Sequence, residues 1–552
     1  MAKRTRRASP APPKTRKRRP VVPEDLLRFR LLSSPRISPD GGRIVFVEKH
    51  VGPKNEYVSN LWMVPVRGGP ARQFTDGGRD SHPRWSPDGR RIAFLPAREE
   101  HLPQIYAIGA DGGEAIPLTG FPEGKIGQFR FAPDGKLLAV AFRAQDPQRT
   151  EEAEKRREEE GRSTPPWVID DWWYRLDGDG CFGAQRYGVY QVDAGTGEHR
   201  LLYAEDTMGT MDFDFSPDSR ELVVATNRDP QAMIRPWQAE LLRIRCAGGR
   251  IRPIPDLPKG PKRCVRWSPD GKTVAYTGRP GTDGAYSVEN LELFVCDARR
   301  GGARSLTRET DYCLLAVALA DTSEAAFAPA VEFAPDGSCL YFRLGLEGQT
   351  HVASVPTAGG EVAIHTRGPL ELELGNLSAD GRRMALSMGG PTKLAEVAVA
   401  EVGAGRFKTT MLTDLNGPLV AELALAKPEP HRVAAEDGHE VQVWVMKPPG
   451  ARPGRKLPAV LEIHGGPHAM YGSAFFHEFQ VLAGAGYAVF YANPRGSKGY
   501  GRDHCAAIRG AWGSADWTDV KAVIRFMKKK ENSKKISFSK KEFEYVLSTD
   551  VQ

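Results

Sequence analysis

VRWSPDGKTVAYT, residues 265–277, is one of seven copies of a single pattern that recurs through most of this chain. Each copy has an apolar-alternating strand, a Ser/Ala-Pro-Asp-Gly turn, a polar pair and a second apolar strand. The other copies are PRISPDGGRIVFV (35–47), HPRWSPDGRRIAFL (82–95), FRFAPDGKLLAVAF (129–142), DFDFSPDSRELVVAT (212–226), VEFAPDGSCLYFR (331–343) and the degraded NLSADGRRMALSM (376–388). The equivalent turn residues are Asp40, Asp88, Asp134, Asp218, Asp270, Asp336 and Asp380.

The pattern predicts a β-hairpin. Proline sets φ for the first turn position, aspartate bonds the backbone two residues on, and glycine takes the positive φ that follows. One hairpin cannot bury its apolar face alone, whereas a recurrence every 44 to 84 residues leaves room for about four strands per unit. The alternative, seven unrelated surface turns, is disfavoured by the shared strand context. We therefore predict an all-β seven-bladed propeller over residues 23–425.

The net charge of +8 comes from one end of the chain. Residues 1–20 carry nine Lys and Arg and no acid, and subtracting these nine leaves −1 for the remainder. This Pro- and Ala-rich stretch has no apolar periodicity, so we expect a disordered basic arm over residues 1–22. It is interpreted either as a localisation or nucleic-acid-binding tag or as a solvated tail with no dedicated partner, and no other feature favours nucleic acid.

The remaining composition limits the chemistry. The seven cysteines are scattered and never form C-x-x-C, which favours reduced thiols in a cytoplasmic protein. The sequence has no H-E-x-x-H and no Walker loop, so we expect neither a metal nor another cofactor. No signal peptide is recognisable, and no stretch approaches about 18 apolar residues, so no membrane span is expected.

An insertion between the third and fourth copies carries a candidate substrate pocket. Its charged part, EEAEKRREEEGR from Glu151, is typical of a solvated helix or loop. The following WVIDDWWYRLDGDG places Asp170, Asp171, Trp173, Tyr174 and Arg175 together. The acidic pair could hold the ammonium group of a peptide and the arginine a carboxylate. The alternative is aromatic packing between blades.

From residue 426 the periodicity changes. A hairpin with an Asp437-Gly438 turn is followed by the buried strand LPAVLEI, a glycine loop, a helix, the buried strand YAVFYAN and a second amphipathic helix. Strands that alternate with helices indicate a parallel α/β sheet. The sequence thus predicts the first half of an α/β-hydrolase domain over residues 426–527.

The glycine loop is the candidate catalytic feature. It reads His464-Gly465-Gly466-Pro467 and follows directly on a buried strand. Acyl transfer needs backbone N–H donors that are already aimed at the developing oxyanion, and glycines let the backbone approach the substrate. A tight strand-to-helix turn would use the same residues, but the strand context favours an oxyanion loop.

IHGGPHAMYG (463–472), NPRGSKGYGRDH (493–504) and RGAWGSADWTDV (509–520), together with the blades and YRLDGDG (174–180), resemble the prolyl oligopeptidase family of serine peptidases. The similarity is greatest to its acylaminoacyl-peptidase and dipeptidyl-peptidase-like bacterial branch. The resemblance implies a propeller that caps an α/β-hydrolase domain, a Ser-Asp-His triad and short peptides as substrates. It also implies oxyanion stabilisation at Gly466.

The nucleophile motif of that family is missing from this sequence. No serine has glycine at both −2 and +2, and Ser473, Ser497 and Ser514 all fail this test of the G-x-S-x-G elbow. Residues 528–552 contain seven Lys and no Arg, unlike the Arg-rich chain before them. We therefore expect a C-terminally truncated hydrolase domain with a foreign-looking tail, and no catalytic triad residue can be named.

Two functions follow from these observations. The first is a serine-type peptidase that acts on short peptides, inactive as written because the nucleophile elbow is absent. The second is a non-catalytic β-propeller module that binds peptides or proteins. Neither the peptide specificity nor the presence of a homo-oligomer follows from the sequence.

Overall fold

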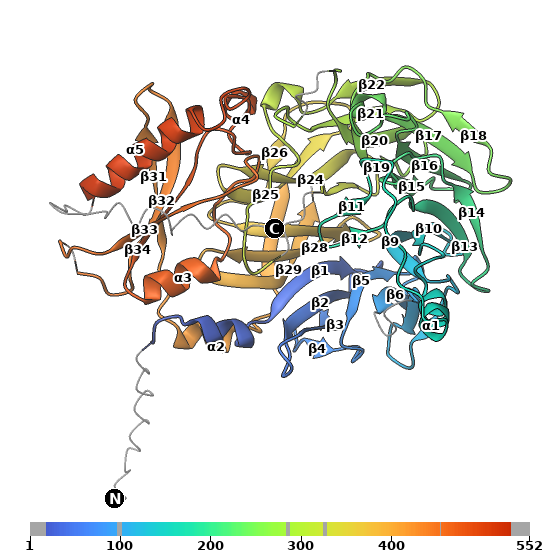
Figure 1. The fold of residues 1–552 in the computed structure, drawn as a ribbon, viewed down its shortest axis with the longest axis horizontal. Coiled ribbons are helices and arrows are strands. Elements are labelled where there is room, and N and C mark those ends of the chain that lie inside the picture. Colours follow the sequence, from blue (N-terminus) through green and yellow to red (C-terminus); the bar gives the residue numbers. More distant parts are fainter. Residues whose placement is uncertain are drawn as a thin grey trace, which may run out of the picture.

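Figure 1 shows the computed structural model of the chain, which describes residues 18–96, 102–282, 287–323, 328–403, 405–452 and 454–530. Within these residues, seven consecutive four-stranded antiparallel sheets form the predicted seven-bladed propeller, drawn from blue to yellow. The first three blades are β1 (Leu31–Ile37), β2 (Arg43–Val51), β3 (Tyr57–Pro65) and β4 (Arg72–Gln73); β5 (Asp80–Trp85), β6 (Arg91–Pro96), β7 (Tyr106–Gly109) and β8 (Ile116–Pro117); β9 (Gly124–Phe131), β10 (Leu137–Ala144), β13 (Gly188–Asp193) and β14 (His199–Tyr203).

The other four blades follow the same order from the axis outward. They are β15 (Asp212–Phe215), β16 (Glu221–Thr226), β17 (Glu240–Arg245) and β18 (Ile251–Pro253); β19 (Lys262–Trp267), β20 (Thr273–Gly278), β21 (Glu292–Asp297) and β22 (Gly301–Ser305); β23 (Val331–Phe333), β24 (Cys339–Leu346), β25 (Gln349–Pro356) and β26 (Ala363–Ile364); β27 (Glu371–Leu377), β28 (Arg383–Gly390), β29 (Lys393–Gly403) and β30 (Arg406–Met411). Short 3-10 helices lie at η2 (Pro236–Gln238) and η3 (Arg308–Thr310).

The predicted turn chemistry is present between the first and second strands of the blades. In the fifth blade the Ser268 hydroxyl donates to Asp270 Oδ1 at 2.7 Å, and Lys272 N donates to the same oxygen at 3.0 Å. Gly271 then takes a φ of +73°, which favours glycine. In the fourth blade Ser219 occupies this position at a φ of +61°. The local sequence therefore determines each hairpin.

Apolar faces of neighbouring blades pack on one another, as the repeat argument requires. One buried cluster combines Leu32, Ile44 and Phe46 of the first blade with Val397 and Val399 of the last. The ring closes without exchange of a strand. Instead, Asn376 Oδ1 accepts from Ile37 N at 2.9 Å and Asn376 Nδ2 donates to Ile37 O at 3.1 Å.

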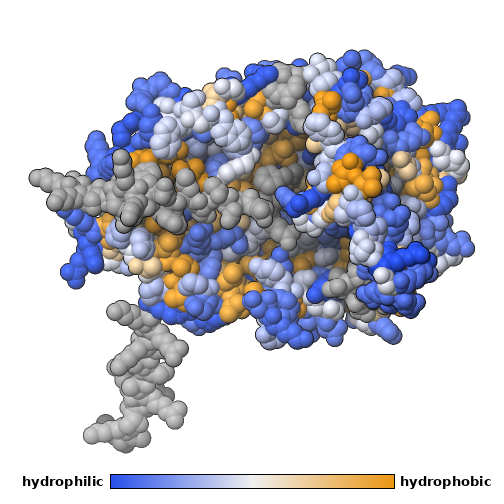
Figure 2. Space-filling model, in the orientation of Figure 1, coloured by the Kyte–Doolittle hydropathy of each residue, from blue (hydrophilic) through white to orange (hydrophobic). Residues whose placement is uncertain are grey.

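The insertion in the third blade consists of α1 (Glu151–Glu159) and a small hairpin, β11 (Arg175–Leu176) with β12 (Gly180–Cys181). The charged stretch is thus a helix, begun by Thr150, whose side chain accepts from Ala153 N. Figure 2 shows it as a hydrophilic area at the lower right, which confirms the expected solvated surface.

The C-terminal part, drawn in orange and red at the left of Figure 1, is a mixed sheet of order β31-β32-β34-β33. Among the described strands of this sheet, β33 and β34 pair in parallel, whereas β31 with β32 and β32 with β34 pair antiparallel. Alternate residues of its strands face different helices, because Val443 and Val445 pack with Val523 of α5 whereas Trp444 packs with Phe479 of α3. The elements are β31 (Pro428–Ala434), β32 (Glu440–Met446), β33 (Ala459–Ile463), α3 (His477–Gly484), β34 (Ala488–Asn493), α4 (Arg502–Ala506) and α5 (Ala515–Lys530).

One boundary expected from the sequence needs correction. Arg19 and Val21, which were expected to lie in the disordered basic arm, make packing contacts: Arg19 N donates to Glu422 O at 2.9 Å, and Val21 is 2% exposed beside Phe475. In the sequence Arg19 looks like the rest of a basic run, whereas in the fold it pairs with the buried Asp25 at 2.5 Å. The helices η1 (Pro23–Arg28) and α2 (Gly417–Glu422) lie outside the seven sheets, which span residues 31–411.

The expected arm up to residue 17 and nearly all of the lysine-rich tail, from residue 531, lie outside the described residues. Within the described part of the chain, no helix is both long and apolar enough to cross a bilayer.

Candidate functional site

The His464-Gly465-Gly466-Pro467 loop lies at the carboxyl end of β33, next to its parallel neighbour β34. Gly465 and Gly466 are exposed, and a Cβ added to either would meet no atom within 4 Å. Gly466 has a φ of +90°, in the region that favours glycine. The loop therefore presents backbone to open space at the sheet edge where ligands of open α/β sheets bind.

His464 is a buried support of this loop. Its Nε2 lies 3.0 Å from Ser497 Oγ and its Nδ1 lies 3.1 Å from Gly465 O. Burial lowers the pKa of His464 below its usual value, against smaller raising effects of Gly465 and Asn493. A neutral imidazole has one N–H, which serves either the carbonyl oxygen of Gly465 from Nδ1 or the hydroxyl oxygen of Ser497 from Nε2; the second arrangement is compatible with the 2.7 Å bond from the Ser497 hydroxyl to Pro494 O. The ring thus ties the loop to the segment after β34.

Asn493, the last residue of β34, is the second support; the family resemblance implied only a packing role for the stretch 493–501 to which it belongs. Its Oδ1 accepts from Tyr471 N at 2.7 Å, and its Nδ2 donates to Tyr471 O at 2.8 Å. Nδ2 also donates to Tyr500 Oη, whose hydroxyl donates to Gln442 Oε1, each at 2.6 Å. The amide therefore holds the chain that follows Pro467 against the end of the sheet.

Glu462, two residues before His464, is an acid in an otherwise apolar strand. It is 8% exposed, and burial followed by repulsion from Glu478 raises its pKa to about 7. Burial thus disfavours the charged form of the Glu462 carboxyl, in the strand that leads into the loop. In the sequence, an acid that interrupts the apolar run of a buried strand was the signal that could have identified Glu462.

The three serines considered from the sequence do not form a nucleophile site. Ser497 meets His464, but it is fully buried and its hydroxyl donates to Pro494 O. Ser473 is 4% exposed, and the Ser514 hydroxyl donates to Ala511 O at 2.7 Å. An activated serine needs an accessible Oγ that donates to a base, and none of these three shows that geometry.

The candidate pocket residues of the insertion are only partly brought together. Asp171 accepts from Arg186 Nη2 at 2.7 Å, and Trp173 lies 6.2 Å from Phe182 in a tilted ring contact. Asp170 and Arg175 are exposed, and Tyr174 is half-buried with its carbonyl bonded to Phe182 N. No described hydrogen bond, ion pair or ring contact joins this segment to residues 464–467. The pocket remains a prediction.

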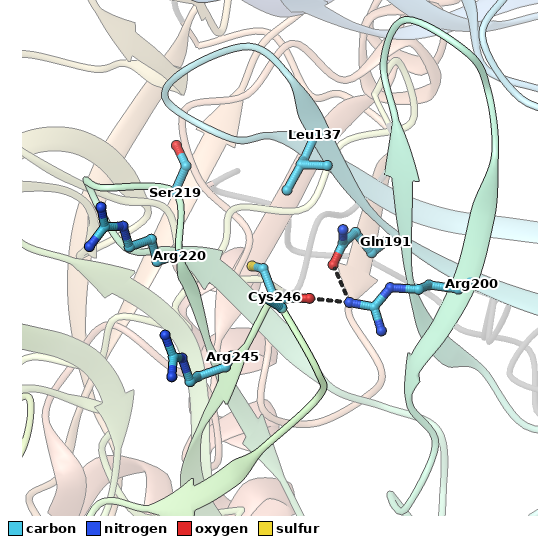
Figure 3. Close-up of a pocket in the computed structure, with 8 residues that line it drawn as sticks. Leu137, Gln191, Arg200, Ser219, Arg220, Arg245 and Cys246 are labelled. Atoms are coloured by element: carbon cyan, nitrogen blue, oxygen red, sulfur yellow. Dashed lines mark hydrogen bonds between the residues drawn. The ribbon is translucent and has the colours of Figure 1, made fainter.

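A cavity of about 390 Å³ lies between blades of the propeller and shares no residue with the glycine loop. Figure 3 shows it between the third and fourth blades, where Arg200 donates to Gln191 and to the carbonyl oxygen of Cys246. It is also lined by Arg220 and Arg245, both exposed. Within the described residues, no group of three or more His, Cys, Asp and Glu side chains is placed to hold a metal ion.

Comparison with known proteins gives two family matches, a TolB beta propeller domain over residues 17–162 and the prolyl oligopeptidase family over residues 473–535. An uncharacterized peptidase, YuxL of Bacillus subtilis, is 30% identical over 511 residues, which are 91% of this chain and 75% of the relative. Dipeptidyl-peptidase 5 of Porphyromonas gingivalis is 24% identical over 522 residues, 92% and 73% of the two chains.

The fold agrees with these relatives. The structure of an acylaminoacyl peptidase from Pyrococcus horikoshii superposes with a TM-score of 0.72 at 20% identity, over 92% of this chain and 72% of that one. At this identity the likeness shows the fold, a propeller followed by a hydrolase-type sheet.

Proposed function

Since the chain belongs to the prolyl oligopeptidase family of serine peptidases, we propose that it recognises short peptides in the manner of an acylaminoacyl- or dipeptidyl-peptidase. The observation that carries this proposal is the exposed Gly465-Gly466 backbone at the carboxyl end of a parallel strand. Such a backbone can donate hydrogen bonds to the carbonyl oxygen of a bound peptide, and more strongly to an oxyanion. The names of the relatives support the two substrate classes.

We further propose that this 552-residue polypeptide does not itself form an acyl-enzyme. The sequence has no G-x-S-x-G, and the three serines nearest the loop in sequence are engaged or buried. The propeller and oxyanion loop would thus bind peptide without the covalent step. The alternative of a non-catalytic β-propeller module that binds peptides or proteins is not favoured as the function from which this chain derives, because relatives named as peptidases align over more than nine-tenths of it.

Calorimetric titration with two matched peptides tests the specificity. N-acetyl-dialanine amide offers an acylated N-terminus, and dialanine amide offers a free ammonium group. Preferential binding of the first supports the acylaminoacyl class and of the second the dipeptidyl class. If neither peptide binds at millimolar concentration, the proposal of short-peptide recognition is wrong.

A further inference from the structure

The innermost strands of the seven blades carry a ring of polar side chains that the peptidase site does not use. Its members stand four residues before each turn aspartate: Arg36, Arg84, Arg130, Asp214, Arg266, Glu332 and Asn376. They belong to β1, β5, β9, β15, β19, β23 and β27, one from each blade. All seven are partly accessible, although every one lies on the strand nearest the axis. We call this set the axial ring.

Contacts show that members of the axial ring reach toward the next blade. Asp214 Oδ2 accepts from Trp267 N at 2.9 Å, and Asn376 Oδ1 accepts from Ile37 N at the same distance. Arg266 Nε donates to Val331 O at 2.9 Å. Arg130 Nη1 lies 3.8 Å from Asp214 Oδ1. These described contacts bridge four of the seven boundaries between blades, at one level of the propeller.

The charges of the axial ring are unbalanced. Arg36, Arg84 and Arg130 come from three consecutive blades, and the nearby acids are partly occupied by backbone: Glu373 Oε2 accepts from Ser34 N at 2.9 Å. The Nε atoms of Arg36 and Arg130 are buried without a hydrogen-bond partner in the described structure. Arg84 Nη1 donates to Pro83 O at 2.9 Å, which supplies no counter-charge.

Electrostatics agrees with this geometry. Burial, then repulsion from Arg36 and Arg130, lowers the pKa of Arg84 well below its usual value, and Glu332 opposes the effect. Burial also lowers the pKa of Arg36, opposed by Glu373 and Glu332. A guanidinium stays protonated in proteins, so the lowered pKa means that its charge is poorly compensated where it stands.

The backbone is strained immediately before three of these arginines. Ser34, His82 and Cys264 have φ values of +54°, +54° and +49°, and each lies two residues before Arg36, Arg84 or Arg266. The register of the inner strand shifts at all three places, between residues 33 and 36, 81 and 84, and 263 and 266. Bulges re-aim side chains, and strain of this kind collects at functional positions.

Backbone N–H groups add to the donors. Ser86 N and Ala132 N donate outward, to Arg91 O and Leu137 O of the second strands. Successive N–H groups of a strand point to opposite edges, so the N–H groups of Trp85 and Phe131 point toward the axis. Asp214 and Asn376 accept the equivalent N–H of the following blade. The side chains of Arg36 and Arg84 cannot accept the N–H groups of Trp85 and Phe131 in this way, because a guanidinium has no hydrogen-bond acceptor.

The axial ring lies at the end of the propeller that faces away from the hydrolase sheet. At the other end of the blades, the β24–β25 turn contacts that sheet's loops: Gly348 O accepts from Ser473 N at 2.7 Å, and Glu347 N donates to Gly499 O at 3.0 Å. The turn with Asp336, four residues after the ring member Glu332, lies at the opposite end of β24 from the β24–β25 turn. The two turns are therefore separated by about 26 Å, at roughly 3.3 Å per residue.

We propose that the arginines of the axial ring form an anion-binding site, which takes a small oxyanion such as phosphate or the carboxylate of a peptide C-terminus. Guanidinium groups bind both of these planar or tetrahedral anions through charge-assisted hydrogen bonds. The proposal does not depend on the peptidase function, because neither the glycine loop nor any serine takes part.

The test is calorimetric titration and thermal unfolding of the full chain with sodium phosphate, at an ionic strength kept constant with sodium chloride. Arg84→Gln removes a ring charge, and Arg245→Gln removes an equal charge from the exposed groove between the third and fourth blades. We expect wild type and Arg245→Gln to bind phosphate alike. Arg84→Gln loses one pair of charge-assisted hydrogen bonds, so its affinity for phosphate should be about tenfold or more below that of wild type.

A second readout separates this role from a structural one. In phosphate-free buffer, Arg84→Gln should unfold at the same or a higher temperature than wild type, because a repulsion among arginines is relieved. Arg36→Gln provides the same test if Arg84→Gln does not fold. Competition by acetyl-dialanine, but not by its amide, would identify the source of the anion as a peptide carboxylate. Binding of phosphate alone would identify a free oxyanion.

Two results would overturn the proposal. One is that neither phosphate nor acetyl-dialanine binds to wild type or raises its unfolding temperature beyond the effect of chloride. The other is that Arg84→Gln and Arg36→Gln bind as tightly as wild type, which would mean an adventitious site elsewhere.

Discussion

Arg495 and Asp519 join the segment after β34 to α5 through four donor–acceptor contacts on one carboxylate. Arg495 N and Nη2 each donate at 2.7 Å, and Nε lies 3.1 Å from both oxygens. Asp519 is fully buried, and Arg495 also donates to Asp437 Oδ2 of the β31–β32 turn at 2.6 Å. The guanidinium thus fixes three separate segments behind the glycine loop.

Asp519→Asn should destabilise the chain strongly. It leaves the largely buried Arg495 with Asp437 alone, and removal of one partner from a buried pair costs about 3 kcal/mol. The unfolding temperature should fall by several degrees. Glu436→Gln is the matched control, because the Glu436–Lys521 pair at 3.1 Å is exposed and surface pairs contribute little. Equal effects of the two substitutions would show that Arg495 does not organise this region.

Gly466→Ala should destabilise the glycine loop by about 1–2 kcal/mol, because an L-residue is strained at a φ of +90°. Gly465→Ala is the control: neither added Cβ meets an atom within 4 Å, and Gly465 does not have a positive φ. Thermal unfolding compares them. An equally large loss of stability in Gly465→Ala would mean that lack of room for a side chain, and not the backbone conformation of Gly466, requires glycine in this loop.

Glu462 should make stability fall as pH rises. Its folded pKa of about 7 lies above the ordinary value of 4.5, so between these pH values the folded state holds a proton that the unfolded state has lost. The penalty grows from about pH 4.5 and is complete above about pH 7, on the order of 3 kcal/mol.

Glu462→Gln removes that penalty. Its unfolding temperature should therefore exceed that of wild type more at pH 8 than at pH 5, and the exposed Glu429→Gln should follow wild type at both. A difference between Glu462→Gln and wild type that does not change with pH would contradict the buried protonated carboxyl.

Hairpins could be predicted from the sequence because their determinants are local. Ser268, Asp270 and Gly271 bond within one turn, and alternation of apolar residues places each strand face. Because one hairpin cannot bury its apolar face alone, seven copies of it predict blades that pack on one another in a closed ring. The strand that leads into the His464 loop was predictable for the same reason, since an apolar run interrupted only by Glu462 ends in the glycine loop.

Contacts between distant segments could not be predicted. Asn376 and Ile37 are 339 residues apart, and Asn493 and Tyr471 are 22 residues apart on different elements. The axial ring also escaped notice, because the position four residues before each turn aspartate holds Arg, Asp, Glu or Asn and acquires meaning only once the blades surround an axis. Arg19 is expected in the disordered arm from its composition alone, because charge composition does not reveal a buried partner such as Asp25.

The central proposal is that this 552-residue polypeptide binds short peptides without an activated serine, and a fluorophosphonate probe tests it most directly. The purified 552-residue polypeptide should show no specific labelling, and should release no chromophore from acylaminoacyl or dipeptidyl nitroanilides, because Ser497 is buried and donates to Pro494 O. Stoichiometric labelling that maps by mass spectrometry to any serine between residues 429 and 552, and that heat denaturation abolishes, would contradict the account.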